Sequence, residues 1–190
     1  MHAVVVGLGN PGPDYAATRH NIGHLVIDEL ATRGGAGLST NRKVNAMSAT
    51  ARLGGDAVVI AKPRSYMNLS GGPVAALARY HSVDPGDVII IHDDLDLPMG
   101  TVRLKRGGGT GGHNGLKDIA KALGTPDFLR VRCGVDRPPG TMDAAVYVLK
   151  SFNAAQRKEL PFLVDTAADA VQSLLSDGLE AAQQRFHTKL

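Results

Sequence analysis

Residues 4 to 15 read V-V-V-G-L-G-N-P-G-P-D-Y, and this stretch with the segment after it decides the fold. The valine run predicts a buried strand, because β-branched runs suit a sheet that is covered on both faces. From Ile22 to Arg33 apolar residues recur at helical spacing, and Gly34-Gly35 ends the pattern. The chain therefore begins with a strand, a loop and a helix.

Outward from this unit, strand and helix patterns continue to alternate, with a hairpin and a glycine-rich loop among them. These patterns predict an α/β fold, a single-domain three-layer sandwich over residues 1–190 in which a mixed, twisted β-sheet is flanked by helices. The predicted elements are a loop over 34–45, a hairpin of 49–52 and 57–61, a helix over 75–80, strands over 88–91, 102–105 and 128–135, a helix over 114–123, and amphipathic helices from about 154.

Composition narrows the class of protein. The 190 residues are 43% hydrophobic, which suits one core, and the net charge of +3 with a pI near 9.1 admits a polyanionic partner without requiring one. Cys133 is the only cysteine, so no internal disulfide forms. No apolar run approaches the roughly 18 residues that span a bilayer, so we expect a cytoplasmic protein without a membrane partner.

The spacing Gly7-x-Gly9-x-x-Gly12 after a strand matches the fingerprint of dinucleotide-binding proteins. Two prolines in this loop remove backbone N–H groups that would face a pyrophosphate, and the acidic residues about 20 positions on lie inside the predicted helix. We therefore expect no nicotinamide cofactor. The loop instead offers Asn10 at the end of a strand, although a plain turn explains this segment equally well.

Amide and imidazole side chains recur at predicted strand ends and helix starts. They lie in Asn10, R-H-N at 19–21, Y-M-N at 66–68 and G-G-H-N-G at 111–115, with Asp93 after a strand. His20 precedes a helix and suits a general base, and Asp93 suits the acceptor that orients it. A capping or surface histidine and a solvated acidic turn, or a Mg²⁺ cluster, are the alternatives.

Other catalytic chemistries find less support in the sequence. H-N-I-G-H at 20–24 lacks the glutamate of H-E-x-x-H, and His92 should point away from Asp93, so we expect no metal. Cys133 lies in a predicted strand, and neither Ser65 nor Ser70 occupies a G-x-S-x-G turn. Direct attack of water on an ester fits these residues better than covalent catalysis.

Basic residues gather around the glycine-rich run 107–112. Glycine-rich backbone beside Lys and Arg predicts a phosphate-binding rim, and a solvated basic face is the alternative. The residues concerned are Arg103, Lys105, Arg106, Lys117, Lys121, Arg130, Arg132 and Arg137.

Taken together, these motifs resemble the bacterial peptidyl-tRNA hydrolases over residues 3 to about 152, ending with Y-V-L-K-S-F. Their order along the chain makes a chance match unattractive. The matching stretches are V-V-G-L-G-N-P-G-P-D-Y with T-R-H-N-I-G, K-P-R-S-Y-M-N-L-S-G, H-D-D-L-D-L-P-M-G with R-L-K, G-G-G-T-G-G-H-N-G-L-K-D, and F-L-R-V-R-C-G-V-D-R-P.

The resemblance implies a monomeric, cytoplasmic, metal-independent esterase that separates a stalled peptide from the 3′ ribose of tRNA. It implies His20 as the base and Asp93 as its partner. The other implied site residues are Asn10, Asn68 and Asn114 around substrate and water, Tyr15 and Met67 lining the peptide side with His113 beside them, and Lys105 and Arg132 against tRNA phosphate, with Arg103 as a secondary candidate.

Departures from the family pattern are few. Arg64-Ser65 stands where the family often has a smaller residue and threonine, and Cys133 and Asp136 interrupt a stretch that is usually aliphatic and basic. These departures concern the tRNA contact near 132–137. A noncatalytic RNA-binding relative of the same fold is the alternative, but a pure binder would not need the amides together with His20 and Asp93.

Overall fold

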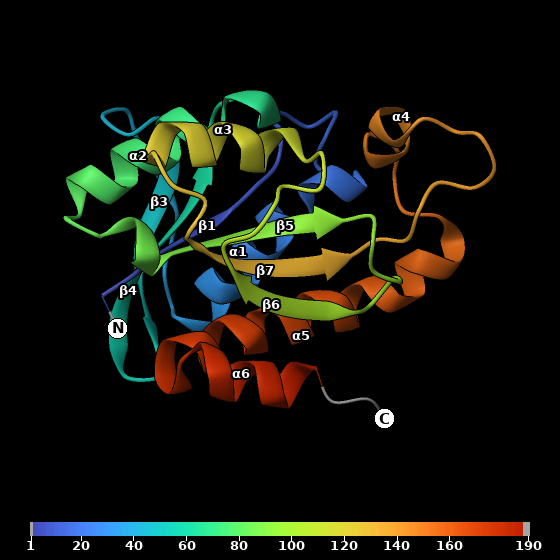
Figure 1. The fold of residues 1–190 in the computed structure, drawn as a ribbon. Helices are drawn as coiled ribbons and strands as arrows, with labels where there is room; N and C mark the ends of the chain where they lie inside the picture. Colours follow the sequence, from blue (N-terminus) through green and yellow to red (C-terminus); the bar gives the residue numbers. More distant parts are fainter. Residues whose placement is uncertain (1, 188–190) are drawn as a thin grey trace.

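The computed structural model describes residues 2–187 and contains one seven-stranded sheet with the order β2-β3-β4-β1-β5-β7-β6 (Figure 1). β1 pairs in parallel with β4 and β5, and β5 pairs in parallel with β7, whereas β6 and β3 run antiparallel to their neighbours. The predicted mixed sheet is therefore confirmed. The strands are β1 (Val4–Gly7), β2 (Ser39–Asn41), β3 (Ala46–Leu53), β4 (Asp56–Pro63), β5 (Val88–Asp94), β6 (Val102–Arg106) and β7 (Leu129–Gly134).

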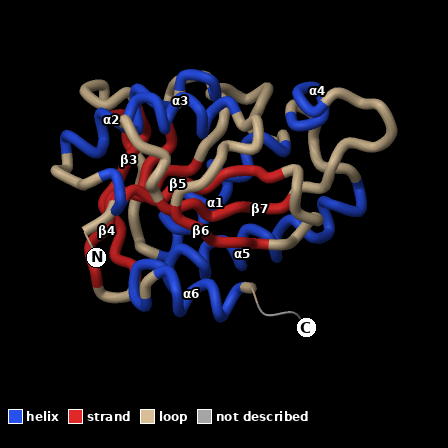
Figure 2. The backbone as a smooth tube through the Cα atoms, in the orientation of Figure 1, coloured by secondary structure: helices blue, strands red, loops and turns tan. Residues whose placement is uncertain are grey.

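Helices cover both faces of the sheet, as the tube in Figure 2 shows. α1, α5 and α6 contribute to one apolar cluster with Val5, and α2 and α3 contribute to the other with Val4 and Val6. Alternate valines of β1 thus enter opposite cores, as a central strand requires. The helices are η1 (Arg19–Asn21), α1 (Ile22–Arg33), η2 (Met67–Leu69), α2 (Gly71–Tyr80), η3 (Pro85–Asp87), α3 (Asn114–Leu123), α4 (Ala144–Val148), α5 (Ala154–Asp177) and α6 (Leu179–Phe186).

The predicted loop over 34–45 was wrong in part, because Ser39–Asn41 pair with β3 as a short edge strand. These polar residues carry no apolar alternation, so only the pairing with β3 defines them as a strand. α4 also has no counterpart among the predicted elements. Both elements are short, with three and five residues, too few to show a clear periodic pattern.

The glycines of the first loop serve close packing. A Cβ on Gly7 would lie 2.0 Å from the carbonyl oxygen of Gly23, and one on Gly9 would lie 2.7 Å from Cδ2 of His24. Such contacts are far inside van der Waals distance, so the loop crosses the start of α1 only because it lacks side chains there. The glycine spacing that resembles a dinucleotide fingerprint therefore has a packing explanation.

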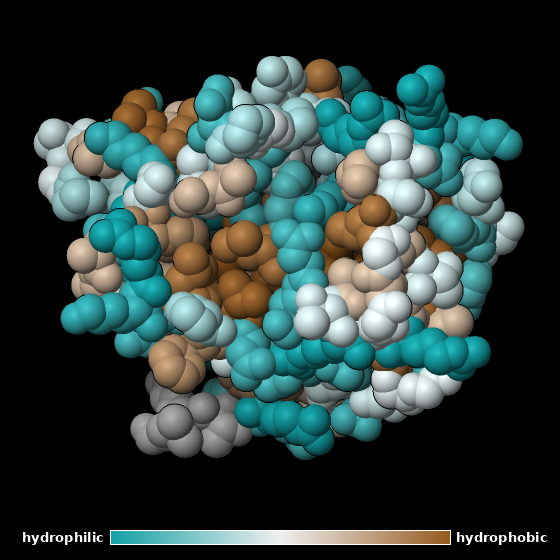
Figure 3. All heavy atoms as spheres, turned by 180° about the vertical axis from the view of Figure 1, so that it is seen from behind, coloured by the Kyte–Doolittle hydropathy of each residue, from teal (hydrophilic) through white to brown (hydrophobic). Residues whose placement is uncertain are grey.

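The surface seen from behind the view of Figure 1 carries polar residues around its margin and apolar residues nearer its centre (Figure 3). Within residues 2–187, no helix combines the length and apolar character needed to cross a membrane.

Candidate active site

A cleft of about 770 Å³ opens beside the carboxyl ends of the parallel strands β1, β5 and β7. In open α/β sheets this edge is where ligands bind. Ten of the site residues implied by the resemblance line this one cleft, and the secondary candidate Arg103 does not. These residues are Asn10, Tyr15, His20, Met67, Asn68, Asp93, Lys105, His113, Asn114 and Arg132.

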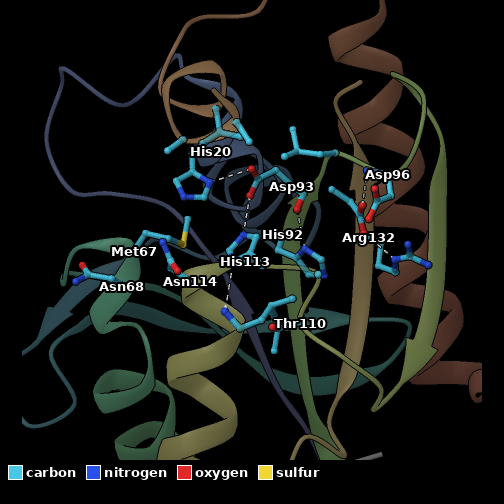
Figure 4. Close-up of a pocket in the computed structure, with 18 of the residues that line it drawn as sticks. His20, Met67, Asn68, His92, Asp93, Asp96, Thr110, His113, Asn114 and Arg132 are labelled. Atoms are coloured by element: carbon cyan, nitrogen blue, oxygen red, sulfur yellow. Dashed lines mark hydrogen bonds and ion pairs between the residues drawn. The ribbon is translucent and has the colours of Figure 1, made fainter. Parts of the chain in front are cut away.

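Asp93 lies at the centre of the cleft and bonds to two histidines (Figure 4). Its Oδ2 lies 2.9 Å from Nδ1 of His20, and its Oδ1 lies 2.9 Å from Nε2 of His113. The Asp93 side chain is 2% exposed, so both oxygens are taken from water and satisfied by imidazole N–H groups. Both histidine orientations therefore depend on one buried carboxylate.

His113 cannot act as a base in this arrangement. Its Nδ1 accepts hydrogen bonds from the backbone N–H groups of Gly115 at 3.1 Å and Leu116 at 3.3 Å, capping the start of α3. Backbone N–H groups only donate, so Nδ1 carries the lone pair and Nε2 carries the proton that points to Asp93. The cap fixes the tautomer and occupies the only basic nitrogen.

His20 has the opposite arrangement. Its Nδ1 donates to Asp93, which leaves the lone pair on Nε2 for a ligand in the cleft. Its side chain is 14% exposed, enough for contact with substrate or water. Burial alone would raise the pKa of Asp93, but His20 and then His113 outweigh it and hold that pKa well below the usual range. The carboxylate therefore stays charged and stabilises an imidazolium at His20.

The same cluster also contains side chains that can bind metals. The candidate ligand atoms of His20, Asp93 and His113 all lie within 4.8 Å of one another. Ligands of tetrahedral zinc, bound at about 2.0–2.1 Å, sit roughly 3.3 Å apart, whereas both histidine–carboxylate pairs here are at 2.9 Å. A metal would also have to replace the proton that the α3 cap fixes on His113. The residues fit a hydrogen-bonded cluster better than a metal site, and His24 takes no part in it.

Asn10 is fixed by two elements of the fold. Its Oδ1 accepts the backbone N–H of Met67 at 2.7 Å, and its own backbone exchanges two bonds with the Asn21 side chain. Because the Met67 N–H requires an acceptor, the oxygen must face it and the Nδ2 amide must face away. Asn10 is buried yet lines the cleft, so its NH₂ group is a preset donor there.

Neutral side chains form the side of the cleft that carries Met67, Asn68 and Asn114 (Figure 4). Tyr15 and Tyr66 also line the cleft, with ring centroids 6.3 Å apart in an edge-to-face arrangement. A Cβ on Gly115 would lie 2.7 Å from Sδ of Met67, so Met67 packs onto the start of α3 only because that residue is glycine. This side offers apolar surface with exposed amides at its edge.

The opposite side of the cleft is formed by the glycine-rich loop 107–112, which packs on the fully buried side chain of Arg130. Its guanidinium donates to the carbonyls of Gly109 at 2.6 Å, Gly108 at 3.2 Å and Pro126 at 3.0 Å. Arg130 was predicted as part of the phosphate-binding rim, and it lies at the cleft, but its side chain is buried and supports the loop from beneath. Contacts with the backbone at 108–109, which strand periodicity does not reveal, bury the Arg130 side chain.

The other predicted phosphate contacts occupy different positions. Lys105 lines the cleft, and its pKa is lowered by burial and then by the nearby cations Arg130 and Arg132. Arg132 also lines the cleft, with its Nε 2.8 Å from Oδ2 of Asp94. Arg103 is not among the residues that line the cleft and instead donates to the carbonyl of Phe186 at 3.2 Å. The geometry thus favours Lys105 and Arg132 over Arg103.

A buried hydrogen-bond network around Arg19, the residue before His20, was not predicted from the sequence. Arg19 donates to Oε1 of Gln156 at 2.9 and 3.1 Å and stacks over the ring of Tyr147 at 3.8 Å, and Tyr147 lies in α4. Gln156 in turn donates to Oδ2 of Asp136 at 3.0 Å. Asp136 therefore takes part in the support of the cleft wall formed by α4, and it is not placed as a tRNA contact.

The side chains considered as nucleophiles are unsuitable. Cys133 is buried in β7, and burial followed by the charges of Asp93 and Asp94 raises its thiol pKa. Ser70 donates its hydroxyl to the carbonyl of Met67 at 2.6 Å, and the Ser65 hydroxyl is buried. Neither serine lines the cleft. Activated water is the remaining attacking group among the candidates considered.

Fold and site together define the class, an α/β protein with a histidine bonded to a buried carboxylate at the carboxyl edge of its sheet. The family model for peptidyl-tRNA hydrolase matches residues 4–190. The chain belongs to the peptidyl-tRNA hydrolase family.

Relatives and solved structures agree with this assignment. The chain is 62% identical to a peptidyl-tRNA hydrolase of Nocardia farcinica over 97% of this chain and 96% of that one. It is 57% identical to one of Pseudarthrobacter chlorophenolicus over 97% and 94%. The crystal structure of peptidyl-tRNA hydrolase from Acinetobacter baumannii matches with a TM-score of 0.91 at 34% identity, over 97% of this chain and 94% of that one.

Proposed function

We propose that this protein hydrolyses the ester that joins the peptide to the 3′ ribose of tRNA in peptidyl-tRNA. The observation that carries the proposal is the state of His20, whose Nδ1 is held by Asp93 while Nε2 remains available in the cleft. A neutral imidazole fixed in this tautomer is the form required of a general base. Its neighbour His113 lacks that capacity because the α3 cap uses its lone pair.

In the proposed reaction His20 Nε2 takes a proton from water as the water oxygen attacks the ester carbonyl. The bond from the carbonyl carbon to the 3′ oxygen then breaks, and His20 returns the proton to that oxygen. The products are tRNA with a 3′ hydroxyl and a peptide whose new carboxylic acid releases its proton to solvent to become a carboxylate. Asp93 stabilises the transient imidazolium, and His113 supports Asp93 from its other oxygen.

Asn10 is the proposed donor to the oxygen on which charge develops. Its NH₂ is preset because Oδ1 already accepts from Met67, so no rearrangement is needed at the moment of reaction. Asn68 and Asn114 are exposed amides at the same side of the cleft and are proposed to hold peptide backbone and water. Tyr15 and Met67 are proposed to line the path of the peptide.

Lys105 and Arg132 are proposed to contact tRNA phosphate. Both line the cleft on the side of the glycine-rich loop, which is also the side on which buried Arg130 places a positive charge. Clustered cations beside exposed backbone favour a polyanion. The RNA half and the peptide half of the substrate then occupy different sides of the His20–Asp93–His113 cluster (Figure 4).

We further propose that residues 1–190 act as one domain, as a monomer, in the cytoplasm, without a cofactor or metal and without membrane contact. The cleft supports the monomer, because one chain supplies both its catalytic cluster and its basic side. The noncatalytic RNA-binding alternative is not favoured. It gives no reason for a histidine held in the basic tautomer on a buried carboxylate.

The test is hydrolysis of N-acetylated aminoacyl-tRNA in excess EDTA by the wild type and by His20→Ala. We expect the wild type to cleave the ester and His20→Ala to lose about 10²–10⁴-fold in kcat, the usual contribution of a general base. Binding of tRNA should change little, because the proposed phosphate contacts lie elsewhere in the cleft.

His81→Ala is the matched control, since His81 lies outside the cleft and bonds to His2. It should retain full activity. Folded wild type that binds tRNA but cleaves no ester would overturn the proposed function in favour of RNA binding alone. Activity that disappears with EDTA would instead require a metal.

A further inference from the structure

A second, open hollow of about 380 Å³ adjoins the cleft. Asn68 and Asn114 line both, so the two are continuous through these amides. Its remaining lining residues are Lys117, Asp118 and Lys121 of α3. The sequence grouped these lysines with the rim around the glycine-rich loop, but the structure places them at a different hollow.

The hollow presents positive charge. Asn114, Lys117 and Lys121 follow one face of α3 at helical spacing, and both lysines are exposed. Among residues 2–187 neither lysine forms an ion pair. Oδ2 of Asp118 accepts the backbone N–H of Gly71 at 2.8 Å, so this carboxylate is directed to the start of α2. The lysine side chains remain available to a ligand.

The position of the hollow favours peptide over RNA as the occupant. Asn68 and Asn114 lie on one side of the His20–Asp93–His113 cluster, and Arg132 lies on the other (Figure 4). An ester held at His20 has its RNA half directed toward the cations of the glycine-rich side. Its peptide half then runs over Asn68 and Asn114 and continues into the hollow.

We infer that this hollow binds residues of the peptide upstream of the ester, and that Lys117 and Lys121 favour peptides with Asp or Glu there. The inference rests on the proposed function and adds a substrate preference to it. α3 rises about 1.5 Å per residue, which places Lys117 roughly 4.5 Å and Lys121 roughly 10 Å beyond Asn114. An extended peptide advances about 3.3 Å per residue, so the lysines face positions about one to three residues upstream of the residue at Asn114.

The test compares two tetrapeptidyl-tRNAs that differ only by Glu or Gln at the third residue from the ester. At low salt we expect the wild type to prefer the Glu substrate about two- to fivefold in kcat/KM, as an exposed ion pair provides. The double variant Lys117→Gln/Lys121→Gln should bring this ratio to about one. Lys117→Arg/Lys121→Arg, which keeps the charges, should preserve it.

High salt should also abolish the preference in the wild type, since exposed charges are screened. A wild type that cleaves both substrates equally at low salt overturns the inference and leaves the proposed function standing. A preference that persists in the double Gln variant overturns it too. If that variant instead keeps the ratio but binds uncharged tRNA more weakly, the hollow holds RNA. Wild type that cleaves neither substrate refutes the proposed function itself.

Discussion

Two glycine-rich loops line the cleft, and each packs over one basic side chain. The loop 7–12 crosses His24, whose buried Nε2 has no hydrogen-bond partner within residues 2–187. Burial, with a smaller effect of Lys62, lowers the pKa of His24 to about 4, so this support is uncharged at neutral pH. The loop 107–112 rests on Arg130, whose guanidinium stays charged and binds the loop carbonyls.

The difference matches what each loop offers the substrate. An uncharged support leaves the Asn10 amide as the main polar group of its loop, which suits stabilisation of a reaction intermediate. The charged Arg130 side chain forms hydrogen bonds to loop carbonyls that would otherwise repel phosphate, and it adds positive potential beneath them. Substitutions in the two loops should therefore separate catalysis from RNA binding.

The largest effect is expected from Asn10→Asp. The new carboxylate keeps an oxygen for the Met67 N–H but replaces the donor NH₂ with an acceptor. Loss of one preset donor to a developing oxyanion reduces kcat by about 10²–10³-fold. Steady-state hydrolysis of N-acetylated aminoacyl-tRNA measures this. Asn41→Asp is the matched control, because its Oδ1 accepts the backbone N–H of Lys43 away from the cleft. Unchanged kcat in Asn10→Asp would remove Asn10 from catalysis.

Arg130→Met is expected to damage the other loop. It leaves the carbonyls of Gly108, Gly109 and Pro126 without their charged donor. We expect a loss of about 2–3 kcal/mol in the free energy of unfolding, together with weaker tRNA binding. Urea unfolding and filter binding measure the two. Arg103→Met, which removes an arginine outside the cleft, should change tRNA binding far less; equal losses would contradict the assigned difference.

Low pH should weaken the packing of His24 under the loop 7–12 and leave the Arg130 contacts under the loop 107–112 intact. The folded-state pKa of His24 is about 4, below the ordinary value of 6.5, so its stabilisation is complete above 6.5 and is lost as pH falls toward 4. By pH 5 the unfolded chain has taken up a proton that the folded chain has not, which costs about 2 kcal/mol. His92, with a pKa of about 3 caused first by burial, adds a similar loss.

His24→Leu should remove about half of this dependence in urea unfolding between pH 7 and 5, because the similar contribution of His92 remains, and His81→Leu should leave most of it. Asp93 contributes little in this range, because its lowered pKa makes its stabilisation disappear only below about 4. A stability curve for His24→Leu that still follows the wild type would show that His24 is protonated in the folded protein.

The smallest effect is expected at the partly buried cations Lys105 and Arg132. Lys105→Ala and Arg132→Ala should each weaken tRNA binding and reduce the slope of log Kd against log salt by about 0.7–0.9, one phosphate contact. Arg132→Ala should be the more severe, since it leaves Asp94 without its ion pair. Arg103→Ala is the control. An unchanged slope would exclude the residue concerned from the RNA contact.

Local pattern was sufficient for the strongly periodic elements. The predicted helices over Ile22–Arg33 and 114–123 agree with α1 and α3 residue for residue. Their apolar spacing and their boundaries are encoded within the segment itself. β2 and α4 were not predicted, because one consists of polar residues that pair with β3 and the other is a five-residue helix with no amphipathic pattern.

The candidate site divides in the same way into features that local sequence pattern predicts and features that depend on long-range contacts. Motif positions at strand ends were enough to place the candidate residues in one cleft, since parallel strands end at a common edge. The sequence named His20 as the candidate base, but the reason that His113 cannot serve was beyond it, because that depends on the cap that His113 forms at the start of α3. The role of Arg130 was also beyond it, because its partners Gly108 and Gly109 lie more than 20 residues away in the sequence.

The contact between Arg19 and Gln156 has a consequence for synthesis. The residue next to His20 is held by a side chain 137 positions later in the chain. A ribosome must therefore make most of the protein before the turn that carries His20 gains this support. The growing chain is itself a peptide esterified to tRNA, the bond that the finished protein is proposed to cut. The turn that carries His20 lacks this support until Gln156 has been added and has left the ribosome.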